Sequence, residues 1–214
     1  MFMNTLIISI FVCIISTLFV LSVAYCMSRL RFKIRKTYMN IAMILGLFPG
    51  FMSMVAVYYI LKIMGLSEGA MIRVALVLVY SGASGLGFYI AKGFFDTIPK
   101  SLDEAARVDG ATRAQVLFKI TLPMAKPIII YTVLTAFMAP WGDFMFASYI
   151  AHNTGDGMNV AVGLQNLIGT NSSLAANYTH FCAGGVLVAI PVTILFMCLQ
   201  KYYVEGVTGG AVKG

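Results

Sequence analysis

The sequence is dominated by long runs without a charged side chain. Residues 1–28 contain none, and the stretch 5–27 is long enough to cross about 30 Å of hydrocarbon as a helix. Four further runs have a similar length and character: residues 37–61, 74–91, 127–150 and 181–200. A chain with these runs is expected to form an all-α, polytopic membrane helix bundle with five transmembrane helices.

Composition supports the same fold class. Of the 214 residues, 60% are hydrophobic and 11% are charged, whereas a soluble domain carries about 25% charged residues. The net charge of +7 could suggest a nucleic-acid partner, but basic residues in cytoplasmic loops explain it more simply. We therefore expect residues 1–214 to form a single transmembrane domain.

The distribution of Lys and Arg predicts the topology. With the segment 29–36 placed inside, thirteen of the fifteen basic residues are cytoplasmic, and only Lys62 and Arg73 lie outside. The N-terminus is then external and the tail 201–214 is cytoplasmic. An uncharged N-terminus is easier to place outside when another helix precedes it, so we expect a further upstream span.

A polar island, residues 101–123, interrupts the apolar runs. Ser101 with Glu104, and Thr112 with Gln115, have the spacing of capping boxes, which mark helix starts. Gly110 lies between them, where a left-handed helix cap favours glycine. The pattern predicts a helix-turn-helix whose second helix ends before Pro123.

This island resembles the EAA loop of ABC importer permeases. The matching residues are Glu104, Ala105, Ala106, Gly110, Ile120, Leu122 and Pro123. The small alanines permit close contact with another protein, and Asp109 adds charge beside it. The resemblance implies that residues 93–126 form a cytoplasmic coupling loop seated on an ATPase subunit. The alternative is an ordinary amphipathic loop between membrane helices.

The glycine-rich tail, residues 206–214, resembles the C-terminus of maltose-type permeases. In that family the tail inserts between two ATPase subunits. The resemblance implies a carbohydrate importer, usually with six membrane helices, located in a bacterial cell membrane. Malto-oligosaccharides are the expected substrate, followed by galacto-oligosaccharides; another solute class, such as amino acids or phosphate, is the alternative.

The fourth expected span contains an acidic residue, Asp143, between the aromatic residues Trp141 and Phe144. An ionisable side chain at membrane depth usually faces protein or a water-filled path. These three residues could therefore line a sugar path, and the resemblance supports this although Gly142 replaces an Asn of the family pattern. Alternatively, Trp141 anchors the interface and Asp143 is hydrated at the headgroup level.

Residues 152–178 are polar and are expected to form an outer loop. By resemblance, this loop reaches the external solute-binding protein through Gln165, Asn166, Gly169 and Asn171. The alternative is a re-entrant or core-packing helix over residues 160–168. The histidines and cysteines lack metal-ligand spacing, so no metal site is expected.

The sequence contains no phosphate-cradling Gly-x-x-x-x-Gly-Lys-Ser/Thr motif and no catalytic constellation. We therefore expect a non-enzymatic subunit without a cofactor of its own, with ATP and Mg²⁺ bound by a partner ATPase dimer. The other expected partners are a second permease, a solute-binding protein, the sugar and membrane lipid. A secondary transporter and a membrane-tethered DNA-binding protein fit less well, because Asp143 has no evident acidic partner and the island lacks a basic, groove-reading helix.

Overall fold

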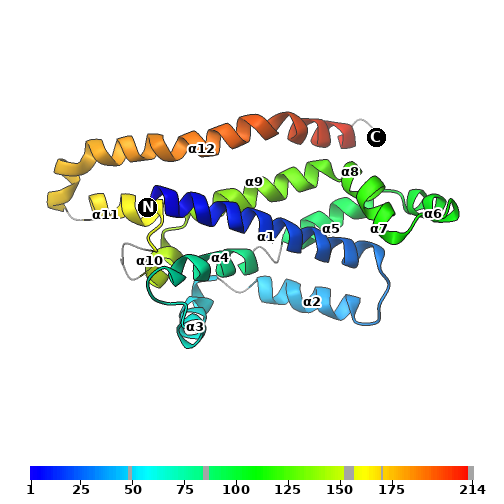
Figure 1. The fold of residues 1–214 in the computed structure, drawn as a ribbon, viewed down its shortest axis with the longest axis horizontal. Helices are drawn as coiled ribbons and strands as arrows, with labels where there is room; N and C mark the ends of the chain where they lie inside the picture. Colours follow the sequence, from blue (N-terminus) through cyan, green and yellow to red (C-terminus); the bar gives the residue numbers. More distant parts are fainter. Residues whose placement is uncertain (48–49, 84–86, 152–156, 170, 212–214) are drawn as a thin grey trace.

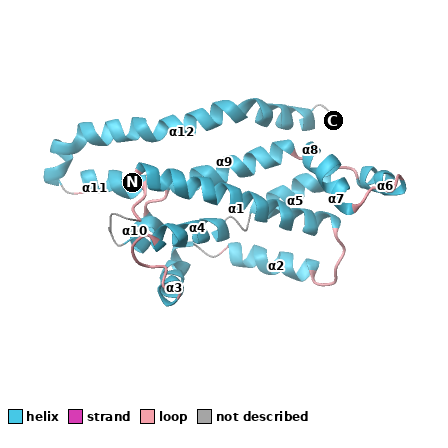
Figure 2. Cartoon of the chain, in the orientation of Figure 1, coloured by secondary structure: helices cyan, strands magenta, loops and turns pink. Residues whose placement is uncertain are grey.

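The computed structural model describes residues 1–47, 50–83, 87–151, 157–169 and 171–211, and over these ranges the chain forms helices and no strands (Figures 1 and 2). The all-α prediction is therefore confirmed. The helices are α1 (Phe2–Arg29), α2 (Arg35–Gly46), α3 (Gly50–Ile63), α4 (Met71–Ala83), α5 (Gly87–Thr97), α6 (Lys100–Val108), α7 (Arg113–Val116), α8 (Leu122–Met124), α9 (Lys126–Gly142), α10 (Met145–Ala151), α11 (Val160–Ile168) and α12 (Asn171–Ala211). A π-helical turn, Leu117–Thr121, connects α7 to α8.

Helix α1 is the central element of the bundle, and α4, α5 and α9 pack against it (Figure 1). Its buried positions recur every three or four residues and include the small polar side chains Thr5, Ser9 and Ser16. Small side chains on one stripe let neighbouring helices approach closely. The other side of α1 is apolar and exposed, as expected of a helix that faces lipid.

Two hydrophobic clusters lie along α1. One surrounds Ile8 and Val12 and is completed by residues of α4, α10 and α11. The other surrounds Val20 and Ala24 and is completed by α5 and the start of α9, with Phe95 fully buried in it. The second cluster lies at the end of the bundle that carries α6 and α7 (Figure 1).

The expected number of five spans is not reproduced. In the described residues, α1 and the segment Ala176–Lys201 of α12 are each long and apolar enough to cross a membrane. Two bent helix pairs could each form one more span: α4 with α5, at 44°, and Arg113–Met124 with α9, at 77°. By length and composition, the described part of the chain therefore has two helices that could cross a membrane, or up to four if each bent pair is one span.

The second expected span, residues 37–61, is divided between α2 and α3. These helices have 12 and 14 residues, fewer than the roughly 20 that a straight crossing requires. Gly50 begins α3, whereas Pro49, where a kink was expected, lies outside the described residues.

The fourth expected span, residues 127–150, is interrupted at Asp143. Helix α9 ends at Gly142 and α10 begins at Met145, with Asp143 in an extended conformation (φ −84°, ψ 110°). The prediction of one continuous helix was wrong, because the Asp143 carboxylate bonds to the backbone of the following turn instead of continuing the helix.

The region beyond α10 is also more helical than expected. Residues 160–168 form α11, with Val160, Val162 and Gly163 buried, which confirms the alternative of a packed helix. Helix α12 starts at Asn171 and runs to Ala211, so residues 171–178 do not form a loop and the expected tail continues the helix at least to Ala211. Residues 152–156, which include His152, lie outside the described part of the chain.

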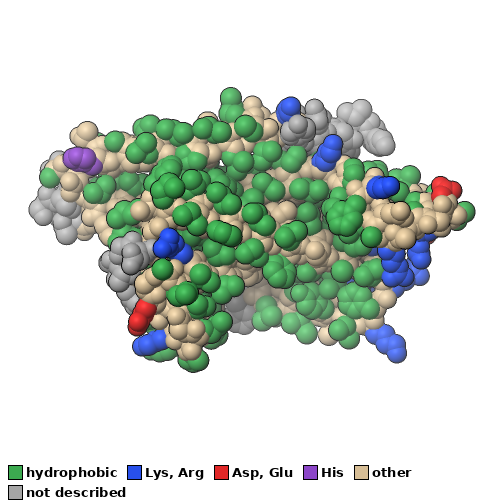
Figure 3. Space-filling view, in the orientation of Figure 1, with side chains coloured by type: hydrophobic (Ala, Val, Ile, Leu, Met, Phe, Trp, Pro, Cys, Tyr) green, Lys and Arg blue, Asp and Glu red, His purple; other side chains and the backbone are tan. Residues whose placement is uncertain are grey.

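Charged side chains gather near the two ends of the molecule, and hydrophobic side chains cover the length between them (Figure 3). At one end lie α6, α7 and the connection between α1 and α2 (Figure 1). At the other end lie α3, α10 and the N-terminus. This arrangement is typical of a bundle whose middle is surrounded by lipid.

Candidate functional site: a helix-turn-helix at the end of the bundle

The helix-turn-helix predicted from the polar island is present. Gly110 has φ +85°, in the left-handed region that favours glycine. The amide of Ala111 donates to the carbonyl of Ala106 at 2.9 Å, and the amide of Gly110 donates to the carbonyl of Arg107 at 3.1 Å. These two bonds form a Schellman motif, which ends α6 and reverses the chain.

The second helix begins as expected. The Thr112 side chain accepts from the Gln115 amide at 3.3 Å, and the Gln115 side chain accepts from the Thr112 amide at 2.8 Å. This reciprocal pair is a capping box. The turn between α6 and α7 is therefore fixed by its own hydrogen bonds.

The first helix begins differently from the prediction. Helix α6 starts at Lys100 after Pro99, and no side-chain bond caps it. The capping box expected from Ser101 and Glu104 was wrong, because both residues already lie inside the helix. Glu104 is consequently exposed rather than turned back on the backbone.

The second helix also continues past its expected end. After α7 the chain forms the π-helical turn, then α8, which contains Pro123, and bends at Ala125 into α9. In the wider turn, the Leu122 amide bonds to the carbonyl of Leu117, five residues back. This change of hydrogen-bond register accommodates the proline without ending the helix.

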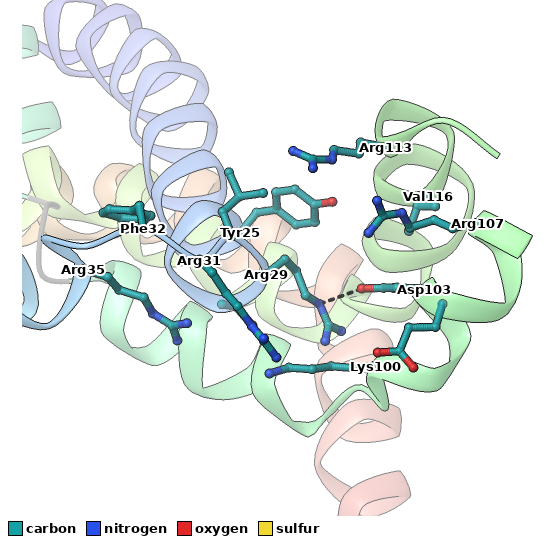
Figure 4. Close-up of a pocket in the computed structure, with 13 residues that line it drawn as sticks. Tyr25, Arg29, Arg31, Phe32, Arg35, Lys100, Asp103, Arg107, Arg113 and Val116 are labelled. Carbon is teal, nitrogen blue, oxygen red and sulfur yellow. Dashed lines mark ion pairs between the residues drawn. The ribbon is translucent and has the colours of Figure 1, made fainter. Parts of the chain in front are cut away.

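The helix-turn-helix is anchored to α1 by a buried ion pair. The Nε atom of Arg29, in the last turn of α1, lies 3.1 Å from a carboxylate oxygen of Asp103 in α6, and their side chains are 5% and 15% exposed (Figure 4). Arg29 also donates to the carbonyl of Ile98 at 3.0 Å. Beside it, the Ser28 hydroxyl donates to Asp96 at 2.6 Å, and Lys92 forms an ion pair with Asp96.

Several side chains of α6 that do not face α1 are exposed. Glu104, Ala105 and Asp109 are exposed, and Val108 is 89% exposed. A large apolar side chain displayed at the tip of a helix, next to carboxylates and a small alanine, is suited to a protein contact. Ala106 is half-buried, and its carbonyl takes part in the Schellman motif.

The remaining residues of the EAA-like pattern lie at the junction with α9. Leu122 packs against the second hydrophobic cluster, Ile120 is half-buried and Pro123 is exposed. Thr121, between them, is fully buried and donates to the carbonyl of Val116 at 3.4 Å. The pattern thus spans two parts of the structure, an exposed helix and a packed junction.

Trp141, Asp143 and Phe144 do not converge on one cavity. Trp141 is 5% exposed and packs edge-to-face on Phe2, with ring centroids 5.4 Å apart. Asp143 accepts from the Tyr80 hydroxyl at 2.6 Å. Phe144 points outward and is 40% exposed.

The break at Asp143 is held by a polar network that the sequence did not reveal. Asp143 accepts from the amides of Phe146 and Ala147, both at 3.1 Å, and so caps α10. Asn159, fully buried, donates to the carbonyls of Pro140 at 3.0 Å and Asp143 at 2.6 Å. Its own side-chain oxygen accepts from Val162 at 2.9 Å and caps α11.

The residues expected to meet a binding protein lie at the end of α11. Gln165 and Asn166 are exposed on that helix, and Gly169 is its exposed C-terminal cap. Asn171 is the first residue of α12, and its side chain lies outside the description. Within the described residues, no group of three or more His, Cys, Asp or Glu side chains is placed to hold a metal ion.

Three residues with a role in this structure could not be singled out from the sequence alone: Arg29, Asp103 and Asn159. Arg29 contributed to the predicted topology only as one of many basic residues. Asp103 belongs to no recognisable sequence motif. Each acts through a partner from another helix, and a single sequence gives no signal for such pairs. Asn159 did carry a local signal, since an Asn before an apolar run is a common helix cap.

Comparison with known proteins identifies the family. Residues 16–209 match the family model described as "Binding-protein-dependent transport system inner membrane component". The chain is 37% identical over 214 residues to the galactooligosaccharides transport system permease protein GanQ of Bacillus subtilis, covering 100% of this chain and 74% of that protein. It is 33% identical over 211 residues to the maltodextrin transport system permease protein MdxG of the same organism, covering 99% and 74%.

A solved structure supports the fold. The chain superimposes on a chain of a bacterial ABC transporter involved in the import of the acidic polysaccharide alginate with a TM-score of 0.76, 23% identity, and coverage of 94% of this chain and 74% of that chain. The sequence family, its named relatives and the shared fold agree. The chain belongs to the family of inner-membrane components of binding-protein-dependent ABC transport systems and is a non-catalytic permease of that family.

Proposed function

We propose that this chain forms half of the translocation path of an ATP-driven importer of oligosaccharides. The other half is a homologous permease, and an external solute-binding protein delivers the sugar. ATP and Mg²⁺ are bound by a dimer of ATPase subunits on the cytoplasmic side. The chain itself supplies the path and the mechanical connection to those subunits.

One observation carries this proposal: α6 is exposed on one face and fixed to the membrane helices on the other. Its exposed face presents Ala105 and Val108 to a partner, and Glu104 lies at the border of that face, next to the side that holds Asp103. Its inner face holds Asp103 against Arg29 of α1. A helix anchored in this way transmits a push from outside to the bundle.

Two connections carry the movement into the membrane. The Arg29–Asp103 pair transmits it to α1, around which the other helices pack. The continuous path through α7, the π-helical turn and α8 transmits it to α9, beyond a 77° bend. Closure of the ATPase dimer would then shift α1 and α9 together, which is the requirement for alternating access.

This mechanism places residues 93–126 and the C-terminal end of α12 in the cytoplasm. α6, α7 and the end of α12 lie at the same end of the molecule (Figure 1). The basic connection between α1 and α2 lies there too, in agreement with the positive-inside rule. Gln165, Asn166, Gly169 and Asn171 are then on the outer side, where a binding protein would dock.

The proposed substrates are malto-oligosaccharides and galacto-oligosaccharides. The relatives named above are permeases of a galactooligosaccharide and a maltodextrin transport system. We propose that the region of Trp141, Asp143 and Phe144 borders the path, with Phe144 as the exposed side chain. Trp141 and Asp143 would hold the break between α9 and α10 that gives Phe144 its position.

The coupling proposal is tested by enlarging one exposed side chain. Ala105→Trp should prevent close seating of α6 on the ATPase and reduce uptake of labelled sugar to background in cells, with normal amounts of the chain in the membrane. Ala70→Trp is the matched control, since Ala70 is also exposed but lies beyond α3, at the opposite end. Normal uptake by the Ala105→Trp variant would contradict the coupling role.

The substrate is tested separately. Cells that lack the gene and cells that carry it are compared for uptake of labelled maltose, maltotetraose, galactobiose and galactotetraose. We expect uptake of at least one oligosaccharide series to depend on the gene. If uptake of an amino acid or of phosphate depended on the gene and uptake of the sugars did not, the assignment to oligosaccharides would be overturned. The permease role would remain.

A further inference from the structure

A cavity of about 630 Å³ lies where α1 ends, between the α1–α2 connection and the helix-turn-helix of α6 and α7 (Figure 4). Six cationic side chains line it: Arg29, Arg31, Arg35, Lys100, Arg107 and Arg113. Two carboxylates, Asp103 and Glu104, also line it, which leaves a net charge of +4. The cavity is therefore strongly electropositive.

The positive charges are brought together by the fold. The charged ends of Arg29, Arg31 and Lys100 point toward one another, although they come from α1, the connection after it and the start of α6 (Figure 4). Asp103 is already engaged by Arg29. Like charges held this close repel one another, and an anion between them would remove the repulsion.

Arg29 gives a second, independent indication of a missing anion. Its side chain is 5% exposed, and its Nη1 atom finds no hydrogen-bond acceptor among the described residues. The Oδ1 atom of Asp103, the carboxylate oxygen that does not pair with Arg29, is likewise buried and finds no donor in the described part of the chain. A buried charged donor without an acceptor is unfavourable and uncommon in folded proteins. A ligand that offers both anionic oxygens and a hydroxyl donor would satisfy both atoms.

The location indicates where such a ligand comes from. Residues 1–28 contain no charged side chain, so Arg29 is the charged side chain that directly follows this apolar run and lies where α1 would leave the hydrocarbon. Leu30, Phe32 and Tyr25 add apolar and aromatic surface to the same cavity. Basic residues that directly follow a membrane helix bind anionic lipid headgroups.

From these observations we propose that the cavity binds the phosphodiester headgroup of an anionic phospholipid with headgroup hydroxyls, of the phosphatidylglycerol type. The phosphate oxygens accept from Arg29, Arg31 and Lys100. A glycerol hydroxyl donates to Asp103. Since α6 and α7 form one wall of the cavity, the bound lipid stabilises the position of the helix-turn-helix relative to α1.

The test counts lipids on the full chain purified in detergent. Phosphatidylglycerol is titrated in, and bound lipid is measured by native mass spectrometry for the unmodified chain and for the double variant Arg31→Gln/Lys100→Gln. Both side chains are exposed, so the variant should fold, and circular dichroism checks its helix content. We expect the variant to bind phosphatidylglycerol more weakly by about tenfold or more.

The matched control is Lys33→Gln/Lys36→Gln. Both lysines belong to the same basic segment and their loss changes the charge equally, but neither lines the cavity. We expect this variant to bind as the unmodified chain does. Equal weakening in both variants, or in neither, would overturn the proposal, because binding would then depend on overall charge or on another site.

Two further titrations distinguish the source of the phosphate. Phosphatidylcholine carries the phosphate but no net negative charge, and we expect it not to compete. Inorganic phosphate at millimolar concentration should not displace phosphatidylglycerol. Displacement by inorganic phosphate would overturn the lipid proposal in favour of a free anion. The lipid could also fail to bind while the Arg31→Gln/Lys100→Gln variant no longer assembles with the ATPase. That result would overturn the lipid proposal and indicate that the cavity binds an acidic protein segment instead. None of these readouts depends on transport.

Discussion

At the scale of single residues, the pair of Arg29 and Asp103 shows how a charge can be structural at the edge of a membrane. Arg29 sits at the end of an apolar helix, yet its side chain turns inward and is buried beneath α6. Its charge is balanced by Asp103, and its Nη2 group bonds to the carbonyl of Ile98. The sequence could place Arg29 at the membrane surface, but not its partner, because the pairing depends on how α6 folds back against α1.

We predict that Asp103→Asn destabilises the chain by about 3 kcal/mol, at the lower end of what breaking a buried ion pair costs, since the adjacent cavity admits water. The reason is that Arg29 then stays buried without a countercharge. Chemical denaturation of the purified chain, followed by circular dichroism, measures the loss.

The control for this change is Asp109→Asn, which neutralises an exposed carboxylate at the end of the same helix. It should alter stability by no more than about 0.5 kcal/mol. The double variant Arg29→Met/Asp103→Leu should be more stable than Asp103→Asn alone, because it removes both buried charges. Equal stability of Asp103→Asn and Asp109→Asn would show that the pair contributes nothing.

At the scale of elements, short sequence motifs predicted the structure correctly where that structure depends only on neighbouring residues. Thr112 with Gln115 and the glycine at position 110 defined the turn between α6 and α7, and the structure has these features. Ser101 with Glu104 had the same spacing but made no cap, because the helix started two residues earlier, with Pro99 in the N-cap position. The π-helical turn before Pro123 was not predictable, since no local motif marks it and its buried residue, Thr121, bonds back to the carbonyl of Val116 only in the folded turn.

The break between α9 and α10 depends on one buried side chain, that of Asn159, in addition to Asp143. Asn159 bonds to two carbonyls at the break and caps α11. We predict that Asn159→Ala destabilises the chain by about 2–4 kcal/mol, from a lost cap and buried carbonyls left without donors. Asn159→Ser keeps a capping oxygen but cannot reach the carbonyls, so it should recover about 1 kcal/mol.

The same denaturation experiment compares these variants with Asn166→Ala, an exposed position on α11. That variant should retain the stability of the unmodified chain. If Asn159→Ala were as stable as Asn166→Ala, the break would be held by Asp143 and its contacts alone. If the serine and alanine variants were equal, the cap of α11 would be unimportant.

At the scale of the whole molecule, composition predicted the class, whereas the course of the spans was not predictable; the orientation expected from the charges stays a prediction. Hydropathy identifies apolar runs but does not distinguish one straight crossing from two short helices at an angle. α2 with α3, and α9 with α10, are such cases. The end of the molecule that carries α6 and α7 was more predictable from sequence. The basic residues that mark this end also line its electropositive cavity.

The orientation gives a direct prediction for the assembled transporter. In a chain whose four cysteines, Cys13, Cys26, Cys182 and Cys198, are replaced by alanine, single cysteines are introduced as Ser101→Cys in α6 and Glu68→Cys between α3 and α4. Both positions are exposed. A membrane-impermeant maleimide should label Glu68→Cys in intact cells and Ser101→Cys only in inverted membrane vesicles.

The same reagent then tests contact with the ATPase. Because α6 exposes Ser101 in the chain alone, labelling in inverted vesicles should be several-fold slower when the ATPase subunit is co-expressed and should recover when that subunit is stripped off with urea. Labelling of Ser101→Cys from outside intact cells would reverse the topology and remove the basis for coupling. Ser101→Cys could instead be labelled only in inverted vesicles, at a rate that the ATPase does not change. The topology would then stand, and the docking surface would lie elsewhere on the helix-turn-helix.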